Sequence, residues 1–99
     1  MPARTRYLLA YDISDPRRLR RVHQVAKRYG YALQYSLFVC DLDDVELVRL
    51  RENLRSEIDH RGDRISIFDL GPPTGRGVSC VQQLGRAPRM PPGGEAEIW

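Results

Sequence analysis

The sequence changes from a strand-like to a helix-like pattern within a few residues, between Tyr11 and Pro16. Residues 6–13 are mostly apolar and are bounded by charge on one side and by Asp-Pro on the other, which is typical of a central strand. Asp15 can accept hydrogen bonds from the free amide groups of a first helical turn, and Pro16 has its φ preset for that turn. Apolar residues then recur at helical spacing up to Gly30, where we expect a left-handed residue to end the helix. The pattern therefore predicts a strand over 6–13 and a helix over 16–29.

Residues 31–71 again change between strand-like and helix-like patterns. Apolar and polar residues alternate over 33–42, either as one bent strand or as two short ones, because no turn sequence marks a reversal. Residues 43–59 combine a capping box with an apolar stripe, which predicts a second helix running to about Asp59. Residues 64–70 alternate again and predict a further strand. This order predicts an α+β fold over residues 1–71, a ferredoxin-like βαββαβ unit with both helices on one face of an antiparallel sheet.

The other face of such a sheet would be bare. Apolar side chains on it, for which Tyr7, Leu9 and Phe68 are candidates, would signal a subunit interface, and a homodimer is the simplest closure. Residues 72–99 form a Gly/Pro-rich C-terminal extension that cannot build a core of its own. Within it, residues 78–84 are apolar enough to form an edge strand, given a partner subunit or protein to pair with.

Half of the 16 basic residues lie in the first 30 residues, where eight basic residues stand against two acidic ones. Four arginines occupy the first turns of the predicted helix, where the helix dipole disfavours cations. Phosphate groups would explain this placement, whereas the alternative is a solvated helix face. Ser14 could donate a further hydrogen bond to phosphate, and Phe38 could stack on a base unless it packs in the core. The four arginines are Arg17, Arg18, Arg20 and Arg21.

Composition excludes a membrane protein. No apolar run approaches the roughly 18–20 residues of a membrane-spanning helix, and the stretch after Arg6 is too short for a secretory signal. We therefore expect a cytoplasmic protein. Cys40 and Cys80 lack metal-type spacing, so we expect two reduced thiols without a chemical role.

Several motifs occur in a fixed order over residues 6–71. Tyr11-Asp12-Ile13-Ser14-Asp15 precedes the basic helix, Tyr29-Gly30 ends it, and Gln34-Tyr35-Ser36-Leu37-Phe38 leads into Cys40-Asp41-Leu42. This combination resembles the CRISPR-associated protein 2 family, the small companion of the spacer integrase. The resemblance implies a ferredoxin-like homodimer in which Asp12 lies near the twofold axis beside its symmetry mate.

Asp12 is the candidate catalytic and metal-binding residue. One carboxylate is a poor site for Mg²⁺ or another divalent cation, and without the resemblance Asp12 could simply cap nearby backbone amides. Two Asp12 side chains at a twofold axis would repel each other when ionised and would favour a cation between them. A water activated by that cation could attack a phosphodiester.

Two classes of function follow from these observations. The first is a dimeric scaffold of CRISPR spacer acquisition that binds double-stranded DNA or RNA through the backbone, contacts the integrase subunit, and has metal-dependent endonuclease activity as an additional property. The alternative is a stand-alone Mg²⁺-dependent endoribonuclease or a toxin-like ribonuclease. The long extension over 72–99 favours the first, because a simple nuclease has no evident use for it.

Overall fold

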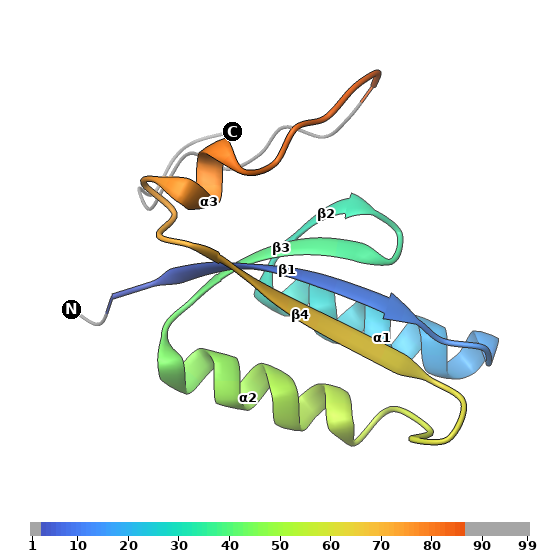
Figure 1. Ribbon diagram of the computed structural model, residues 1–99. Helices are drawn as coiled ribbons and strands as arrows, with labels where there is room; N and C mark the ends of the chain where they lie inside the picture. Colours follow the sequence, from blue (N-terminus) through green and yellow to red (C-terminus); the bar gives the residue numbers. More distant parts are fainter. Residues whose placement is uncertain (1–2, 87–99) are drawn as a thin grey trace.

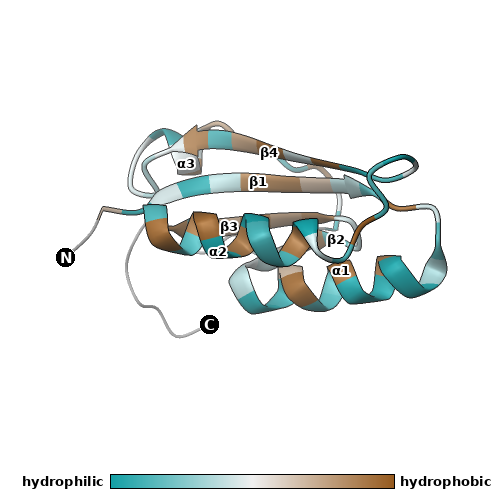
Figure 2. Ribbon diagram, turned by 90° about the horizontal axis from the view of Figure 1, so that it is seen from below, coloured by the Kyte–Doolittle hydropathy of each residue, from teal (hydrophilic) through white to brown (hydrophobic). Residues whose placement is uncertain are grey.

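A computed structural model describes residues 3–86 and shows a four-stranded antiparallel sheet with two helices on one of its faces (Figures 1 and 2). The strands lie in the order β2-β3-β1-β4, and every neighbouring pair is antiparallel. This topology confirms the predicted α+β, ferredoxin-like fold. The strands are β1 (Thr5–Asp12), β2 (Tyr31–Gln34), β3 (Leu37–Leu42) and β4 (Arg64–Gly71), and the helices are α1 (Pro16–Tyr29), α2 (Asp44–Arg55) and the short α3 (Arg76–Ser79).

The two long helices begin where the sequence predicts. The Asp15 side chain accepts a hydrogen bond from the Arg18 amide at 2.9 Å, and Pro16 occupies the first helical position. In α2 the capping box is complete, because Asp43 accepts from the Glu46 amide and Glu46 accepts from the Asp43 amide. Each helix start is thus fixed by side chains within three residues of it.

The end of α2 differs from the prediction, because the helix stops at Arg55 rather than near Asp59. The Asp59 amide donates to the Asp63 carboxylate at 2.9 Å, and the Asp59 side chain accepts from the Arg61 amide at 3.0 Å. These bonds replace the ones that would continue the helix, and they turn the chain towards β4.

Residues 31–42 form two strands rather than one bent strand. Tyr31 pairs with Val39 and Ala32 with Phe38, so β2 and β3 make a hairpin whose turn is Tyr35-Ser36. No residue of this turn has a positive φ, which is why its sequence carries no recognisable turn signal.

Gly30 ends α1 for a reason other than the predicted left-handed backbone. Its φ is −163°, an extended value that any residue adopts. A Cβ atom at this position would lie 2.3 Å from the Val39 carbonyl oxygen and 2.6 Å from the Cys40 Sγ. Glycine is therefore required because the chain passes directly against β3.

The core lies between the sheet and the helices. Tyr7, Leu9 and Tyr11 of β1 are buried on this side. The other buried members of the cluster are Ile13, Val22, Val25, Ala26, Phe38, Cys40, Leu42, Leu50 and Leu54. Burial raises the pKa of the Cys40 thiol to about 12, so this cysteine is protonated and packs as a small apolar residue.

The opposite face of the sheet carries the alternate residues of each strand. Leu8 pairs with Phe68 there, and Phe68 is 51 % exposed. The prediction that Tyr7 and Leu9 lie on the bare face is wrong, because both point to the helices; an apolar run does not reveal which alternate set faces the core. Only Phe68 of the three candidates lies on the uncovered face.

The described part of the C-terminal extension contains α3 and no strand. Gly77 of α3 is buried against the Arg6 side chain. The Arg6 guanidinium makes a bidentate ion pair with Asp41 on the neighbouring strand β3. Residues 78–84, predicted as an edge strand, start in α3 and continue irregularly, because a lone strand has no ladder to join in a single chain. Pairing of this segment with a partner stays a prediction, and the rest of the extension lies outside the described residues. Within residues 3–86 no helix is long and apolar enough to cross a membrane.

We predict that Gly30→Ala lowers the free energy of unfolding by about 1–3 kcal/mol, because the added methyl group forces β3 and α1 apart. Urea unfolding followed by circular dichroism measures this. Gly62→Ala is the matched control, since its nearest neighbour would be the Ser14 hydroxyl at 3.8 Å. Equal losses in the two variants would show that close approach does not determine the residue at position 30.

Candidate nucleic-acid interface

Asp12 is the last residue of β1 and points to the face of the sheet that the helices leave uncovered. Its register partner on β4 is Arg64, and both side chains are exposed. Within residues 3–86 the Asp12 carboxylate makes no hydrogen bond and no ion pair. It is therefore not a local cap, and Asp15 alone caps the helix that follows.

The chain does not hold a complete set of metal ligands by itself. Among the described residues no group of three or more His, Cys, Asp or Glu side chains is placed to bind an ion. Asp12 would supply one carboxylate to a cation that prefers about six oxygen ligands. The donor set fits a divalent cation only if further ligands come from water and from a second subunit.

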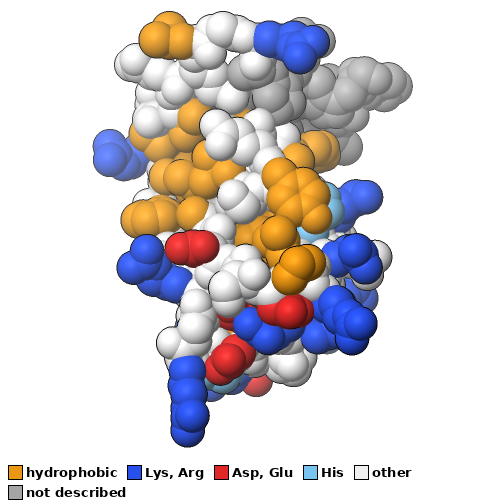
Figure 3. Space-filling view, turned by 90° about the vertical axis from the view of Figure 1, so that its right-hand side faces the viewer, with side chains coloured by type: hydrophobic (Ala, Val, Ile, Leu, Met, Phe, Trp, Pro, Cys, Tyr) orange, Lys and Arg blue, Asp and Glu red, His pale blue; other side chains and the backbone are white. Residues whose placement is uncertain are grey.

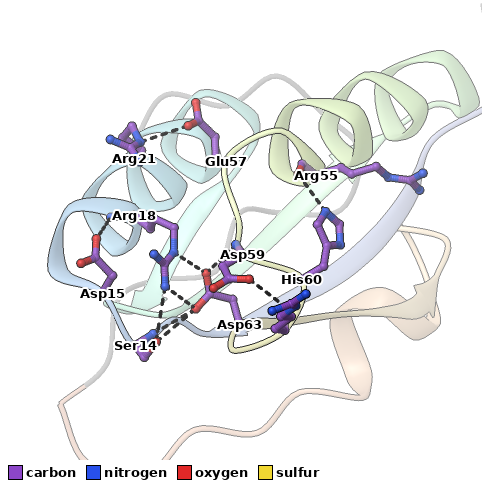
Figure 4. A network of polar contacts seen from close by, with 10 residues as sticks. Ser14, Asp15, Arg18, Arg21, Arg55, Glu57, Asp59, His60 and Asp63 are labelled. Atoms are coloured by element: carbon purple, nitrogen blue, oxygen red, sulfur yellow. Dashed lines mark hydrogen bonds and ion pairs between the residues drawn. The ribbon is translucent and has the colours of Figure 1, made fainter.

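A polar network fixes the backbone beside Asp12 (Figure 4). The Arg18 guanidinium donates to both carboxylate oxygens of Asp63, at 2.7 and 3.3 Å. The same carboxylate accepts from the amides of Ser14 and Asp59, at 3.2 and 2.9 Å. The Asp63 side chain is fully buried. The network thus joins the loop after β1 to the loop before β4.

The Arg18 guanidinium holds the pKa of Asp63 well below its usual range, and the two amides act in the same direction. Together they outweigh the desolvation of the carboxylate, which alone would raise the pKa. Asp63 is consequently an ionised group under all ordinary conditions, and it raises the pKa of Arg18 in turn.

The four arginines of the predicted phosphate cluster divide into two pairs. Arg18 is bound to Asp63, and Arg21 makes an exposed ion pair with Glu57 at 3.1 Å. Arg17 and Arg20 are exposed, and neither makes an ion pair within residues 3–86. The side chains free to meet a phosphate are therefore Arg17 and Arg20.

Two other predicted contacts are also occupied or buried. The Ser14 hydroxyl lies 3.4 Å from the Asp63 carboxylate and 3.5 Å from the Arg18 guanidinium, so it belongs to the network. Phe38 is fully buried and packs against Tyr11 and His23. It cannot stack on a base, so the alternative of a packed Phe38 is correct.

Sequence reasoning missed Asp63 and Arg64. Asp63 lies 45 residues from Arg18, and β4 meets β1 only through the folded sheet. One sequence signal could have found Asp63, namely an acid directly after Gly62 and before a strand, opposite a cluster of arginines. Arg64 carries no such signal, because its position beside Asp12 depends on the register of two distant strands.

Comparison with known proteins gives one consistent result. Residues 5–74 match the family model for CRISPR associated protein Cas2. The chain is 41 % identical to CRISPR-associated endoribonuclease Cas2 2 of Thermodesulfovibrio yellowstonii over 90 % of this chain and 92 % of that one. It is 40 % identical to CRISPR-associated endoribonuclease Cas2 1 of Rhodospirillum rubrum over 82 % and 78 % of the two chains.

Solved structures agree with the curated relatives. The crystal structure of Streptococcus pyogenes Cas2 at pH 6.5 is similar to this chain, with a TM-score of 0.72 and 30 % sequence identity over 81 % of this chain and 99 % of that one. The hypothetical protein TT1823 from Thermus thermophilus is similar with a TM-score of 0.75 and 32 % identity, over 87 % and 96 % of the two chains.

The lowered pKa of Asp63 makes the stability of the fold depend on pH. A carboxylate whose pKa is lower in the folded than in the unfolded chain stabilises the fold above its unfolded pKa of about 4, and this stabilisation is lost as the pH falls further. We predict that Asp63→Asn lowers stability at neutral pH and gives a shallower decline below about pH 4 than the wild type.

Urea unfolding at a series of pH values measures this slope. Asp44→Asn, which removes an exposed carboxylate on α2, should keep the wild-type slope. An unchanged slope in Asp63→Asn would mean that the buried ion pair does not govern acid stability.

Proposed function

Because this chain belongs to the Cas2 family of CRISPR-associated proteins, we propose that it is a dimeric, cytoplasmic nucleic-acid-binding protein of CRISPR spacer acquisition. It binds double-stranded DNA through the phosphate backbone and serves as a scaffold for the integrase subunit. The observation that carries this proposal is the pair of exposed arginines, Arg17 and Arg20, at the start of α1 beside the exposed end of β1, neither of which makes an ion pair within residues 3–86.

The position of these arginines suits phosphate rather than a protein carboxylate. Apart from the N-cap Asp15, whose carboxylate accepts from the Arg18 amide, the first turn of α1 contains no acidic residue to balance the positive end of the helix dipole. Arg17 and Arg20 add two cations to this end. An arriving phosphate would interact favourably with both the dipole and the guanidinium groups. Such contacts are independent of base sequence and sensitive to salt.

The surface around the end of β1 has both charge and apolar area. Figure 3 views the end of the molecule where β1 ends and α1 begins, and it shows a hydrophobic patch above a lower half in which Lys and Arg side chains surround a few Asp and Glu side chains. Phe68, half exposed on the uncovered sheet face, supports closure by a second copy of the chain. The proposed homodimer would thus place basic surfaces from two subunits along one nucleic acid.

The same homodimer would bring a second carboxylate close to Asp12. Asp12 and Asp12 of the partner subunit would hold the cation, with water completing its coordination. A bound Mg²⁺ or another divalent cation would supply a water activated for attack on a phosphodiester. Arg17 and Arg20 would hold the neighbouring phosphates, and the Arg18–Asp63 network would keep the Asp12 backbone in place.

The second candidate function is a stand-alone Mg²⁺-dependent endoribonuclease. It is favoured by the names of the curated relatives, which are CRISPR-associated endoribonucleases. It uses the same Asp12 and the same arginines, and it differs in needing no integrase subunit.

We predict that Arg17→Ala/Arg20→Ala weakens duplex DNA binding and reduces the slope of log affinity against log salt by about 2, because two phosphate contacts are lost. Fluorescence anisotropy at several salt concentrations measures both quantities. Arg49→Ala/Arg51→Ala removes the same charge from exposed positions on α2 and is the matched control. With the integrase subunit present, spacer integration should fall in the first variant and persist in the second.

Equal affinity and slope in the two double variants would show that the arginines form a solvated helix face. If binding and integration are unchanged by Arg17→Ala/Arg20→Ala while RNA cleavage is lost, the endoribonuclease function is the correct one.

A further inference from the structure

We propose that the exposed ring of Tyr35, in the β2–β3 turn, is a stacking site for an unpaired nucleobase. The inference rests on the proposed function and extends it, because it names the substrate as nucleic acid in which an unpaired nucleotide adjoins the segment held by the arginines. In the sequence Tyr35 is one aromatic residue of a motif that also contains Phe38, whereas the structure shows what distinguishes its ring from those of Phe38 and Tyr11.

Tyr35 is the exposed aromatic ring of a stacked pair. Its ring lies parallel to that of His23, with the centroids 4.1 Å apart and 11° between the planes. Yet 54 % of Tyr35 is exposed. Because His23 covers one face of the ring, the exposed area belongs mainly to the other face and the edge. A base stacking there would continue the stack that the two side chains begin.

The turn that carries Tyr35 is fixed by two donors. The buried Tyr11 hydroxyl donates to the Tyr35 carbonyl oxygen at 2.8 Å, and the His23 Nδ1 lies 3.0 Å from the same oxygen. Burial raises the pKa of Tyr11 to about 12, so its phenol keeps the proton that this hydrogen bond needs. The backbone of the turn is therefore held by side chains from β1 and α1.

These contacts also determine the tautomer of His23. The single hydroxyl hydrogen of Tyr11 is used on the Tyr35 carbonyl, so Nδ1 of His23 must carry a hydrogen to bond that carbonyl and the Tyr11 oxygen, which is 3.1 Å away. These hydrogen bonds hold the imidazole nearly parallel to the Tyr35 ring. A preorganised ring of this kind loses little conformational entropy when a base binds.

The stacked pair lies between exposed cations of α1. Arg20 and Lys27 stand three residues before and four residues after His23, so they are its neighbours on the helix surface. Both are exposed, and neither makes an ion pair within residues 3–86. An aromatic face flanked by cations is the arrangement that single-stranded nucleic acids require, with stacking for the base and cations for the backbone. Arg20 is also one of the two arginines that would hold the duplex, so one strand could pass from Arg20 to Tyr35.

The test compares a blunt DNA duplex with the same duplex carrying a short single-stranded overhang, in both polarities, with 2-aminopurine as an unpaired base. We expect the full-length protein to bind the overhang duplex at least about fivefold more tightly than the blunt one and to quench the 2-aminopurine fluorescence. Tyr35→Ala should lose both the preference and the quenching while keeping blunt-duplex affinity. Tyr35→Phe should keep all three properties.

Tyr35→Leu provides a second variant, because it still covers His23 but has no aromatic ring, and thermal unfolding shows whether each variant is folded. Absence of overhang preference and of quenching in the wild type would overturn the stacking site while leaving duplex binding intact. Retention of both in folded Tyr35→Leu would also overturn it. Failure of the wild type to bind even the blunt duplex would overturn the proposed function, and this inference with it.

Discussion

The alternation of side chains along β1 decides where the chemistry of this protein lies. Tyr7, Leu9 and Tyr11 all point to the helices and are buried there. Asp12 is the next residue, so it must point to the opposite face, which α1 and α2 leave uncovered. A shift of one residue would bury the carboxylate and expose the tyrosine. Among the described residues no group of three or more His, Cys, Asp or Glu side chains is placed to bind an ion with Asp12. The fold therefore places Asp12 on the face that a second copy of the chain would cover, where a matching carboxylate could reach it.

One buried carboxylate separates the structural arginines from the free ones. Asp63 takes Arg18 out of the phosphate cluster and uses it to join the two loops beside Asp12. Glu57 binds Arg21 in an ion pair at the surface, where such a pair contributes little stability. Arg17 and Arg20 remain, together with the Tyr35–His23 stack one turn further along α1. The proposed path of a nucleic acid thus follows two arginines that make no ion pair within residues 3–86 and an aromatic ring whose outer face is exposed.

Much of the fold was predictable because its signals are local. The Asp15 cap, Pro16 and the Asp43–Glu46 box fix the helix starts, and hydrophobic periodicity identifies the strands and helices. The prediction failed where contacts join distant residues. The end of α2 depends on Asp63, and the need for Gly30 depends on the approach of β3. The burial of Phe38 depends on which alternate set of each strand faces the helices. The candidate site follows the same division, since Asp12 and the arginines stand in one segment, whereas the roles of Asp63, Arg64 and Tyr35 require the folded sheet.

The central claim is that Asp12 acts only as one of a pair. Dimers carrying two different affinity tags can be purified with no, one or two Asp12→Ala subunits, and their Mg²⁺-dependent cleavage of RNA and duplex DNA can be compared. We predict that the dimer with one substituted subunit is as inactive as the dimer with two, while all three bind the duplex equally. Half of the wild-type cleavage in the dimer with one substituted subunit would contradict the claim, because each Asp12 would then act alone.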